Sequence, residues 1–304
     1  MAYINRGGAY GELKQNDKAF ADFTRAIELN PKSAEAYNSR GVVYLDLKQS
    51  AKAIADYNKA IKLDPKFALA YYNRGKAYAL LKQFDKAITD YTRAIELEPE
   101  WAMAYNNRGN AYLGIQQYDK AIAECNKAIE LDPELAHAYC NRGNAYGELR
   151  QFDKAIADSN KAIELDPKLP QAYMNRGIAY FGLKQYDKAI ADFNRAIELN
   201  PKLRFANGYR GMAYAYLKQY DKAIADYNRA IELDPRATTY HSRGIAYGQL
   251  KQYDKAITDY TKAIELNPND AVAYINRGNA YKEMGKQKEA EADFAKAKML
   301  NEGN

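Results

Sequence analysis

One dipeptide recurs along this chain at a nearly constant interval, and that interval constrains the fold more than any other feature. An arginine is followed by a glycine, and successive copies lie 34 residues apart except for one step of 33, from Gly211 to Gly244. The nine glycines are Gly7, Gly41, Gly75, Gly109, Gly143, Gly177, Gly211, Gly244 and Gly278. A fixed period of this length indicates that one small structural element is repeated, so the fold of the repeat determines the fold of the chain.

The repeat at residues 68–101 predicts two helices joined by a short turn. The first helix is expected over residues 70–81, a break follows at Lys82 and Gln83, and the second helix is expected over residues 85–97. Pro99 then ends the second helix, because proline has no N–H and disfavours helix in the residue before it. The same proline recurs as Pro31, Pro65, Pro133, Pro167, Pro201, Pro235 and Pro268.

Over the whole chain, the repeat resembles the tetratricopeptide repeat family. Besides glycine, five columns (sets of equivalent positions in successive repeats) carry the resemblance. They are the tyrosines from Tyr10 to Tyr281, the alanines from Ala19 to Ala290 and from Ala26 to Ala297, the aromatic column that includes Phe23, Tyr57 and Tyr91, and the closing prolines. One column departs, because arginine stands before every glycine where the family commonly has leucine. The resemblance implies an all-α fold, an α-solenoid in which nine tandem helix-turn-helix repeats form a right-handed superhelix.

We expect a single solenoid domain over residues 1–304. Its repeats are predicted at residues 1–33, 34–67, 68–101, 102–135, 136–169, 170–203, 204–236, 237–270 and 271–304. The first repeat lacks its opening residues, which leaves room for a preceding segment. The last repeat has Glu291 and Lys298 where the others are apolar, which suits a capping repeat whose outer helix meets water.

A helical wheel divides each first helix into two faces. With the glycine at 0° and about 100° per residue, near-constant columns fall between about 200° and 360° and variable columns between about 40° and 140°. Because stacking dictates the constant face, the variable face is the predicted concave binding surface. Its candidate peptide-binding residues are Tyr72, Lys76, Asn106, Asn110, Leu113, Asn144, Met174, Phe181, Phe205 and Met212. The alternative is that individual side chains of this set pack inside the superhelix.

An asparagine column borders this face, two residues before the repeat glycine. In the central repeats it consists of Asn73, Asn107, Asn141 and Asn175. An asparagine both donates and accepts hydrogen bonds, so this ladder is a candidate for gripping the backbone of an extended peptide. A similar ladder lines the repeats of O-linked N-acetylglucosamine transferases. The alternative, given equal weight, is that each asparagine bonds to a neighbouring repeat or to solvent.

The arginine column has an acidic partner column sixteen residues later. Its members are Asp22, Asp56, Asp90, Glu124, Asp158, Asp192, Asp226, Asp259 and Asp293. We expect partly buried ion pairs between the two helices of each repeat. Such pairs fix register more than they add stability, because desolvation offsets much of the attraction.

Several function classes have little support in the sequence. The net charge of +6 comes from 45 basic and 39 acidic residues that are interleaved, without the basic stripe typical of nucleic-acid binding. His137 and Cys140 lie one turn apart, but no third group near them completes a nucleophilic site. We therefore expect no catalytic residue, no metal site and no cofactor. No apolar run reaches the roughly 20 residues of a membrane span, which favours a soluble protein and leaves its compartment open.

The predicted function is a non-enzymatic scaffold that binds a peptide or helical segment of a partner protein in its concave groove. Two alternatives remain open at this point. The chain could self-assemble into a homo-oligomer through its terminal repeats, where Tyr3, Ile4 and Tyr10 form an uncapped edge, or it could be the repeat portion of a larger multidomain protein.

Overall fold

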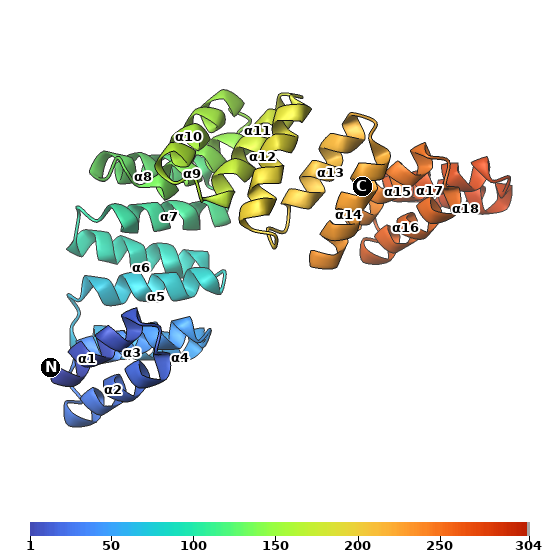
Figure 1. The fold of residues 1–304 in the computed structure, drawn as a ribbon. Helices are drawn as coiled ribbons and strands as arrows, with labels where there is room; N and C mark the ends of the chain where they lie inside the picture. The colour runs from blue at the N-terminus through green and yellow to red at the C-terminus, as the bar shows by residue number, and fades with distance from the viewer. Residues whose placement is uncertain (303–304) are drawn as a thin grey trace. The chain divides into compact units, whose positions relative to one another are not determined.

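The computed structural model describes residues 1–302, and every regular element in those residues is an α-helix (Figure 1). The prediction of an all-α array of helix-turn-helix repeats is confirmed. The chain divides into two compact units, an N-terminal unit from Met1 to Leu149 and a C-terminal unit that begins at Arg150. The division falls inside the fifth predicted repeat, so the single domain stays a prediction, and each unit is described by itself.

The helices follow the predicted repeats closely. The N-terminal unit contains α1 (Ala2–Glu12), α2 (Asn16–Leu29), α3 (Ala34–Asp46), α4 (Ser50–Leu63), α5 (Ala68–Leu80), α6 (Phe84–Leu97), α7 (Ala102–Gly114), α8 (Tyr118–Leu131) and α9 (Ala136–Glu148). The C-terminal unit contains α10 (Phe152–Leu165), α11 (Pro170–Gly182), α12 (Tyr186–Leu199), α13 (Ala206–Tyr216), α14 (Tyr220–Leu233), α15 (Ala237–Gln249), α16 (Tyr253–Leu266), α17 (Ala271–Glu283) and α18 (Gln287–Glu302). Within each unit, consecutive first and second helices pack as antiparallel hairpins, and neighbouring hairpins stack.

The turn inside each hairpin is closed by a left-handed residue. In the third repeat, Gln83 N–H donates to the Tyr78 carbonyl and Lys82 N–H donates to the Ala79 carbonyl, both at 2.9 Å. This pair of bonds ends helix α5 and requires a positive φ, which is 57° at Lys82. The equivalent residues with positive φ are Lys14, Lys48, Gln116, Arg150, Lys184, Lys218, Lys251 and, in the last repeat, Gly285.

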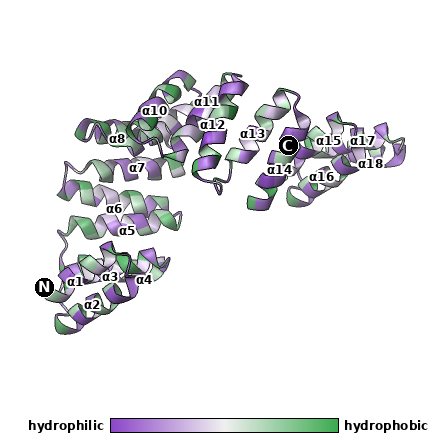
Figure 2. Ribbon diagram, viewed as in Figure 1, coloured by the Kyte–Doolittle hydropathy of each residue, from purple (hydrophilic) through white to green (hydrophobic). Residues whose placement is uncertain are grey.

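The glycine and alanine columns allow the two helices of a hairpin to approach closely. A Cβ added to Gly75 would lie 2.8 Å from Cε1 of Tyr91, so any larger residue would displace that ring. Ala87 and Ala94 on the second helix are fully buried. Hydrophobic and hydrophilic residues are interleaved along the helices (Figure 2), and the hydrophobic ones meet in this interior. The repeat core is therefore built from alanine, glycine and one aromatic ring.

The predicted ion pairs are present in the repeats that lie wholly within one unit. Arg74 Nε donates to Asp90 Oδ2 at 2.8 Å and Arg74 Nη2 donates to Asp90 Oδ1 at 2.6 Å. The equivalent pairs are Arg6–Asp22, Arg40–Asp56, Arg108–Glu124, Arg176–Asp192, Arg210–Asp226, Arg243–Asp259 and Arg277–Asp293. Burial raises the pKa of Asp90, whereas the hydrogen bond from Arg6 lowers the pKa of the end-repeat Asp22. Desolvation therefore offsets the attraction at Asp90 more strongly than at Asp22.

The same arginine also reaches the preceding repeat, which the sequence analysis did not predict. Arg74 Nη1 donates to Asn58 Oδ1 on α4 at 2.6 Å. Equivalent bonds join Arg108 to Thr92, Arg142 to Asn126, Arg176 to Asn160, Arg210 to Asn194, Arg243 to Asn228 and Arg277 to Thr261. One guanidinium therefore joins three helices, two of its own repeat and one of the repeat before it.

Replacing Lys82 with glycine is expected to stabilise the N-terminal unit by about 1 kcal/mol, because glycine adopts the left-handed conformation without the steric cost of a Cβ. Gly285→Lys is the matched reverse change, and a Cβ there meets no atom within 4 Å, so only the backbone cost is added. Urea unfolding midpoints measure both effects. A loss of stability in Lys82→Gly would show that the lysine side chain itself stabilises the turn.

Replacing Arg74 with methionine should cost about 3 kcal/mol at neutral pH, because it leaves the Asp90 carboxylate buried without a partner. The double change Arg74→Met and Asp90→Leu should recover most of that loss. The deficit of the single variant should shrink as the pH falls toward the ordinary aspartate pKa of about 3.9, since a raised folded-state pKa favours the folded state at low pH. Thermal unfolding across this range tests both points, and a pH-independent deficit would contradict the assignment.

Candidate functional site

Neighbouring first helices of a unit enclose a small space, which we call the inter-repeat slot. Three positions bound it: the third residue before a repeat glycine, the second-helix aromatic of that repeat, and the second residue before the next repeat glycine. In the third repeat these are Tyr72, Tyr91 and Asn107. The Tyr72 ring lies 5.8 Å from the Tyr91 ring and 4.4 Å from that of Trp101, centroid to centroid. The Tyr72 hydroxyl accepts a 2.8 Å hydrogen bond from Asn107, so the chain itself fills this slot.

Side chains fill other slots in the same way. The Asn73 amide donates to Asn38 Oδ1 at 3.0 Å, and the Asn141 amide donates to Asn106 Oδ1 at 2.9 Å. In the eighth repeat, the Asn276 amide lies 2.7 Å from Nε2 of His241. Burial lowers the pKa of His241, so its neutral ring can accept this bond. In the sixth repeat, buried Met174 packs in one apolar cluster with Phe193 and Tyr209.

These contacts change the interpretation of half of the predicted surface. Tyr72, Asn106 and Met174 are buried between repeats and are not on an open face, at 9%, 3% and 7% exposure. Asn73, Asn107 and Asn141 donate to the preceding repeat, which is the alternative that the sequence left open, and Asn175 is partly buried on α11. The helical wheel treated each first helix alone, whereas the slot pairs residues 35 positions apart.

The other predicted residues keep accessible surface. In the N-terminal unit, Lys76 and Asn110 are exposed, while Leu113 and Asn144 are partly exposed. In the C-terminal unit, Phe205 is 44% exposed, and Phe181 and Met212 are partly exposed. Phe181 belongs to an aromatic group with Tyr186, Tyr209 and Tyr216, and its ring centroid lies 5.6 Å from that of Tyr216.

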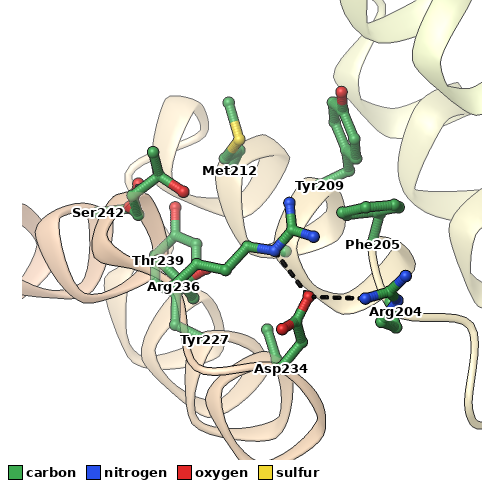
Figure 3. Close-up of a pocket in the computed structure, with 12 residues that line it drawn as sticks. Arg204, Phe205, Tyr209, Met212, Tyr227, Asp234, Arg236, Thr239 and Ser242 are labelled. Carbon is green, nitrogen blue, oxygen red and sulfur yellow. Dashed lines mark hydrogen bonds and ion pairs between the residues drawn. The ribbon is translucent and has the colours of Figure 1, made fainter. Parts of the chain in front are cut away.

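The slot of the seventh repeat is open. Gly208 stands where the third repeat has Tyr72, and Ser242 stands where it has Asn107. A Cβ added to Gly208 would meet no atom within 4 Å. A cavity of about 270 Å³ occupies this place, between Met212, Tyr227, Gly208 and Ser242 (Figure 3). The sequence carried two signs of it that we did not use, the glycine in a variable column and the 33-residue step.

Two arginines and one aspartate lie at the edge of this cavity (Figure 3). Asp234 Oδ2 accepts from Arg236 Nε at 2.6 Å and from Arg204 Nη1 at 3.4 Å. The Arg236 guanidinium lies 4.6 Å from the centre of the Phe205 ring. Because the loop that follows α14 is one residue shorter, Arg236 comes directly after Pro235 and takes the position before α15 that Leu135 and Leu169 hold before α9 and α11. These three ionisable groups carry a net charge of +1.

Two further cavities continue from the first along the C-terminal unit. One, of about 380 Å³, lies between Met212, Tyr216, Ile245 and Gln249. The next, of about 280 Å³, shares Ile245 and Gln249 and reaches Asn279 on α17. Successive cavities share lining residues, and we call the row that they make along α13, α15 and α17 the α13–α17 groove.

The candidate nucleophile Cys140 is buried on α9. Burial raises the pKa of Cys140 to about 12, so its thiol stays protonated and is a poor nucleophile. Residues 1–302 contain no group of three or more His, Cys, Asp or Glu side chains placed to hold a metal ion. Among these residues, no helix combines the length and the apolar character that crossing a membrane requires.

Comparisons with solved structures find the same fold. The chain superposes on a chain of the Cut9–Hcn1 hetero-tetramer of the APC/C with a TM-score of 0.66 at 18% identity, covering 95% of this chain and 57% of that one. A tetratricopeptide repeat protein from Parabacteroides merdae gives 0.62 at 21% identity, covering 81% and 98%. MamA gives 0.51 at 28% identity, covering 53% and 95%. A comparison with curated proteins found no match.

Family models match almost the whole chain. A tetratricopeptide repeat model matches residues 68–100, 102–135, 136–169, 170–203 and 206–236, and a second model of this repeat matches residues 271–304. A third, described as TPR repeat, matches residues 7–48, 43–82 and 244–285. Proteins built from these repeats are typically non-enzymatic scaffolds for protein interaction. The glycine-centred hairpins are tetratricopeptide repeats, and the chain belongs to the tetratricopeptide repeat family.

Proposed function

We propose that the protein is a non-enzymatic scaffold that binds an extended peptide or an amphipathic helix of a partner protein in the α13–α17 groove. The observation that carries this proposal is the row of three cavities with shared lining residues on α13, α15 and α17, one of which occupies the open slot of the seventh repeat. A concave site with apolar walls and a few polar groups is the usual form of a peptide-binding surface.

Exposed apolar side chains support this assignment. Phe205, Tyr216 and Ile245 are 44%, 61% and 42% exposed, and all three line the groove. Clustered apolar exposure of this kind usually marks an interaction surface. Gln249 and Asn279 lie among them and offer amide donors and acceptors to a peptide backbone. They take the role that we first expected of the asparagine column.

In the N-terminal unit, we propose Lys76, Asn110, Leu113 and Asn144 as a separate contact surface. Their side chains keep accessible area on the variable face, while the slots beside them are closed. A ligand there would contact the accessible edges of side chains that fill the slots, such as the ring of Tyr72. The centre of that ring lies 5.8 Å from the Lys76 ammonium. We therefore expect this surface to contribute less to affinity than the α13–α17 groove.

The test is to select peptides from a random library on the wild-type protein and measure their affinities for two variants by fluorescence anisotropy. Phe205→Glu combined with Ile245→Glu should weaken binding at least about tenfold, or about 1.4 kcal/mol, because each change places a carboxylate on the apolar wall. Leu266→Glu is the matched control, since Leu266 is 48% exposed but lies at the end of a second helix. Equal losses in both variants would refute the groove as the site.

Met174→Glu is unsuitable for this test, because Met174 is buried and a carboxylate there should unfold the sixth repeat. Self-assembly through the terminal repeats is distinguished by light scattering, since it predicts a mass that rises with concentration. A peptide receptor would keep one mass in the same experiment.

A further inference from the structure

We propose that the open slot of the seventh repeat binds the side chain of a tyrosine supplied by the partner segment. This inference rests on the proposed function and names one side chain that the bound segment must carry. It comes from a comparison of the chain with itself, because the third repeat places its own tyrosine in the equivalent slot.

The residues around the two slots correspond almost one to one. When positions are counted from the repeat glycines, each residue around Tyr72 in the third repeat has an equivalent residue that lines the open slot of the seventh. The equivalent pairs are Tyr72 and Gly208, Lys76 and Met212, Tyr91 and Tyr227, Ala94 and Ala230, Trp101 and Arg236, Ala104 and Thr239, and Asn107 and Ser242. The seventh repeat therefore keeps the tyrosine and alanine of the inner wall, changes the residues at the rim, and has glycine in place of the tyrosine that fills the slot.

The aromatic ring has two surfaces to pack against. The Tyr227 ring, only 3% exposed, forms the same inner wall that Tyr91 offers to Tyr72. On the other side, the indole of Trp101 is replaced by the guanidinium of Arg236, which already lies over the exposed Phe205 ring. A planar cation is attracted to the face of an aromatic ring, so Arg236 preserves the stacking position in a form that solvent can reach.

The phenolic hydroxyl has a partner of the correct polarity. Asn107 donates to the hydroxyl of Tyr72, whereas Ser242 donates its own proton to the Thr238 carbonyl at 2.9 Å. The Ser242 oxygen, which also lies within hydrogen-bonding reach of the Tyr227 hydroxyl, lines the cavity beside Thr239 and can accept from the hydroxyl of an incoming tyrosine. A phenylalanine would leave this oxygen and the nearby Thr239 hydroxyl without the bond, which is the basis for discriminating between the two side chains.

The binding test uses N-acetyl-L-tyrosinamide as the probe and the methionine methyl groups as NMR reporters. Met212 lines the slot, and the other five methionines serve as internal references. We expect a saturable shift of the Met212 methyl with a dissociation constant on the order of millimolar. N-acetyl-L-phenylalaninamide should bind several-fold more weakly, and N-acetyl-L-alaninamide should give no shift.

Variants at Gly208 separate slot filling from general effects of substitution. Gly208→Tyr should reproduce the third repeat, raise the melting temperature and abolish the Met212 response, and Gly208→Met, which imitates Met174, should do the same if the first variant does not fold. Gly208→Ala is the matched control, because it adds only a Cβ in open space and should bind the probe as the wild type does. Arg236→Gln should weaken probe binding several-fold.

Three results would overturn the proposal: no Met212 response to the tyrosine probe, equal responses to the tyrosine and phenylalanine probes, or an unchanged response in both Gly208→Tyr and Gly208→Met. Its failure is distinguishable from that of the proposed function. Library peptides that need Phe205 and Ile245 but bind equally well to Gly208→Tyr would preserve the groove and refute the tyrosine slot. A specific probe response without any groove-dependent peptide would do the reverse.

Discussion

The arginine before each repeat glycine is the contact on which the rest of the structure depends. Arg74 binds Asp90 through two nitrogens and Asn58 through the third, so one side chain sets the spacing of three helices. Only a planar group with several fixed donors can make all these bonds at once. This requirement explains why arginine occupies a column that is commonly leucine in the family.

The arginines set the spacing of the helices. The residues that bound each inter-repeat slot then determine whether that slot is closed. Alanine and glycine complete the core of the hairpins with one aromatic ring, which Cys125 replaces in the fourth repeat and Ser159 in the fifth. The slot receives a pair of residues that differs from repeat to repeat. Asn38 with Asn73 and Tyr72 with Asn107 are two chemically different ways to close it. Gly208 with Ser242 leaves it open, while the arginine bonds from Arg210 to Asp226 and from Arg243 to Asn228 are still made around it.

The sequence was sufficient to predict the fold, since the period, the turn at Lys82 and the closing prolines each have a direct backbone consequence. The sequence was also sufficient to predict the ion pairs, because the arginine column and the acidic column recur at a fixed spacing. It failed for Tyr72, Asn106 and Met174, because a single-helix wheel cannot represent a contact with the next repeat. Phe205 and Met212 line the first cavity, but the open slot beside them becomes apparent when Gly208 is compared with Ser242 of the next repeat, 34 positions later.

Because each slot is shared, the repeat is not the smallest transferable part of this protein. Gly208 and Arg236 belong to the seventh repeat and Ser242 belongs to the eighth, so neither repeat alone encodes the cavity. Inserting, deleting or shuffling one repeat replaces both partners on its two borders and rewrites two slots together. Recombination within such an array therefore changes recognition one junction between repeats at a time. A designer who wishes to move this cavity must move two adjacent repeats with their shortened loop.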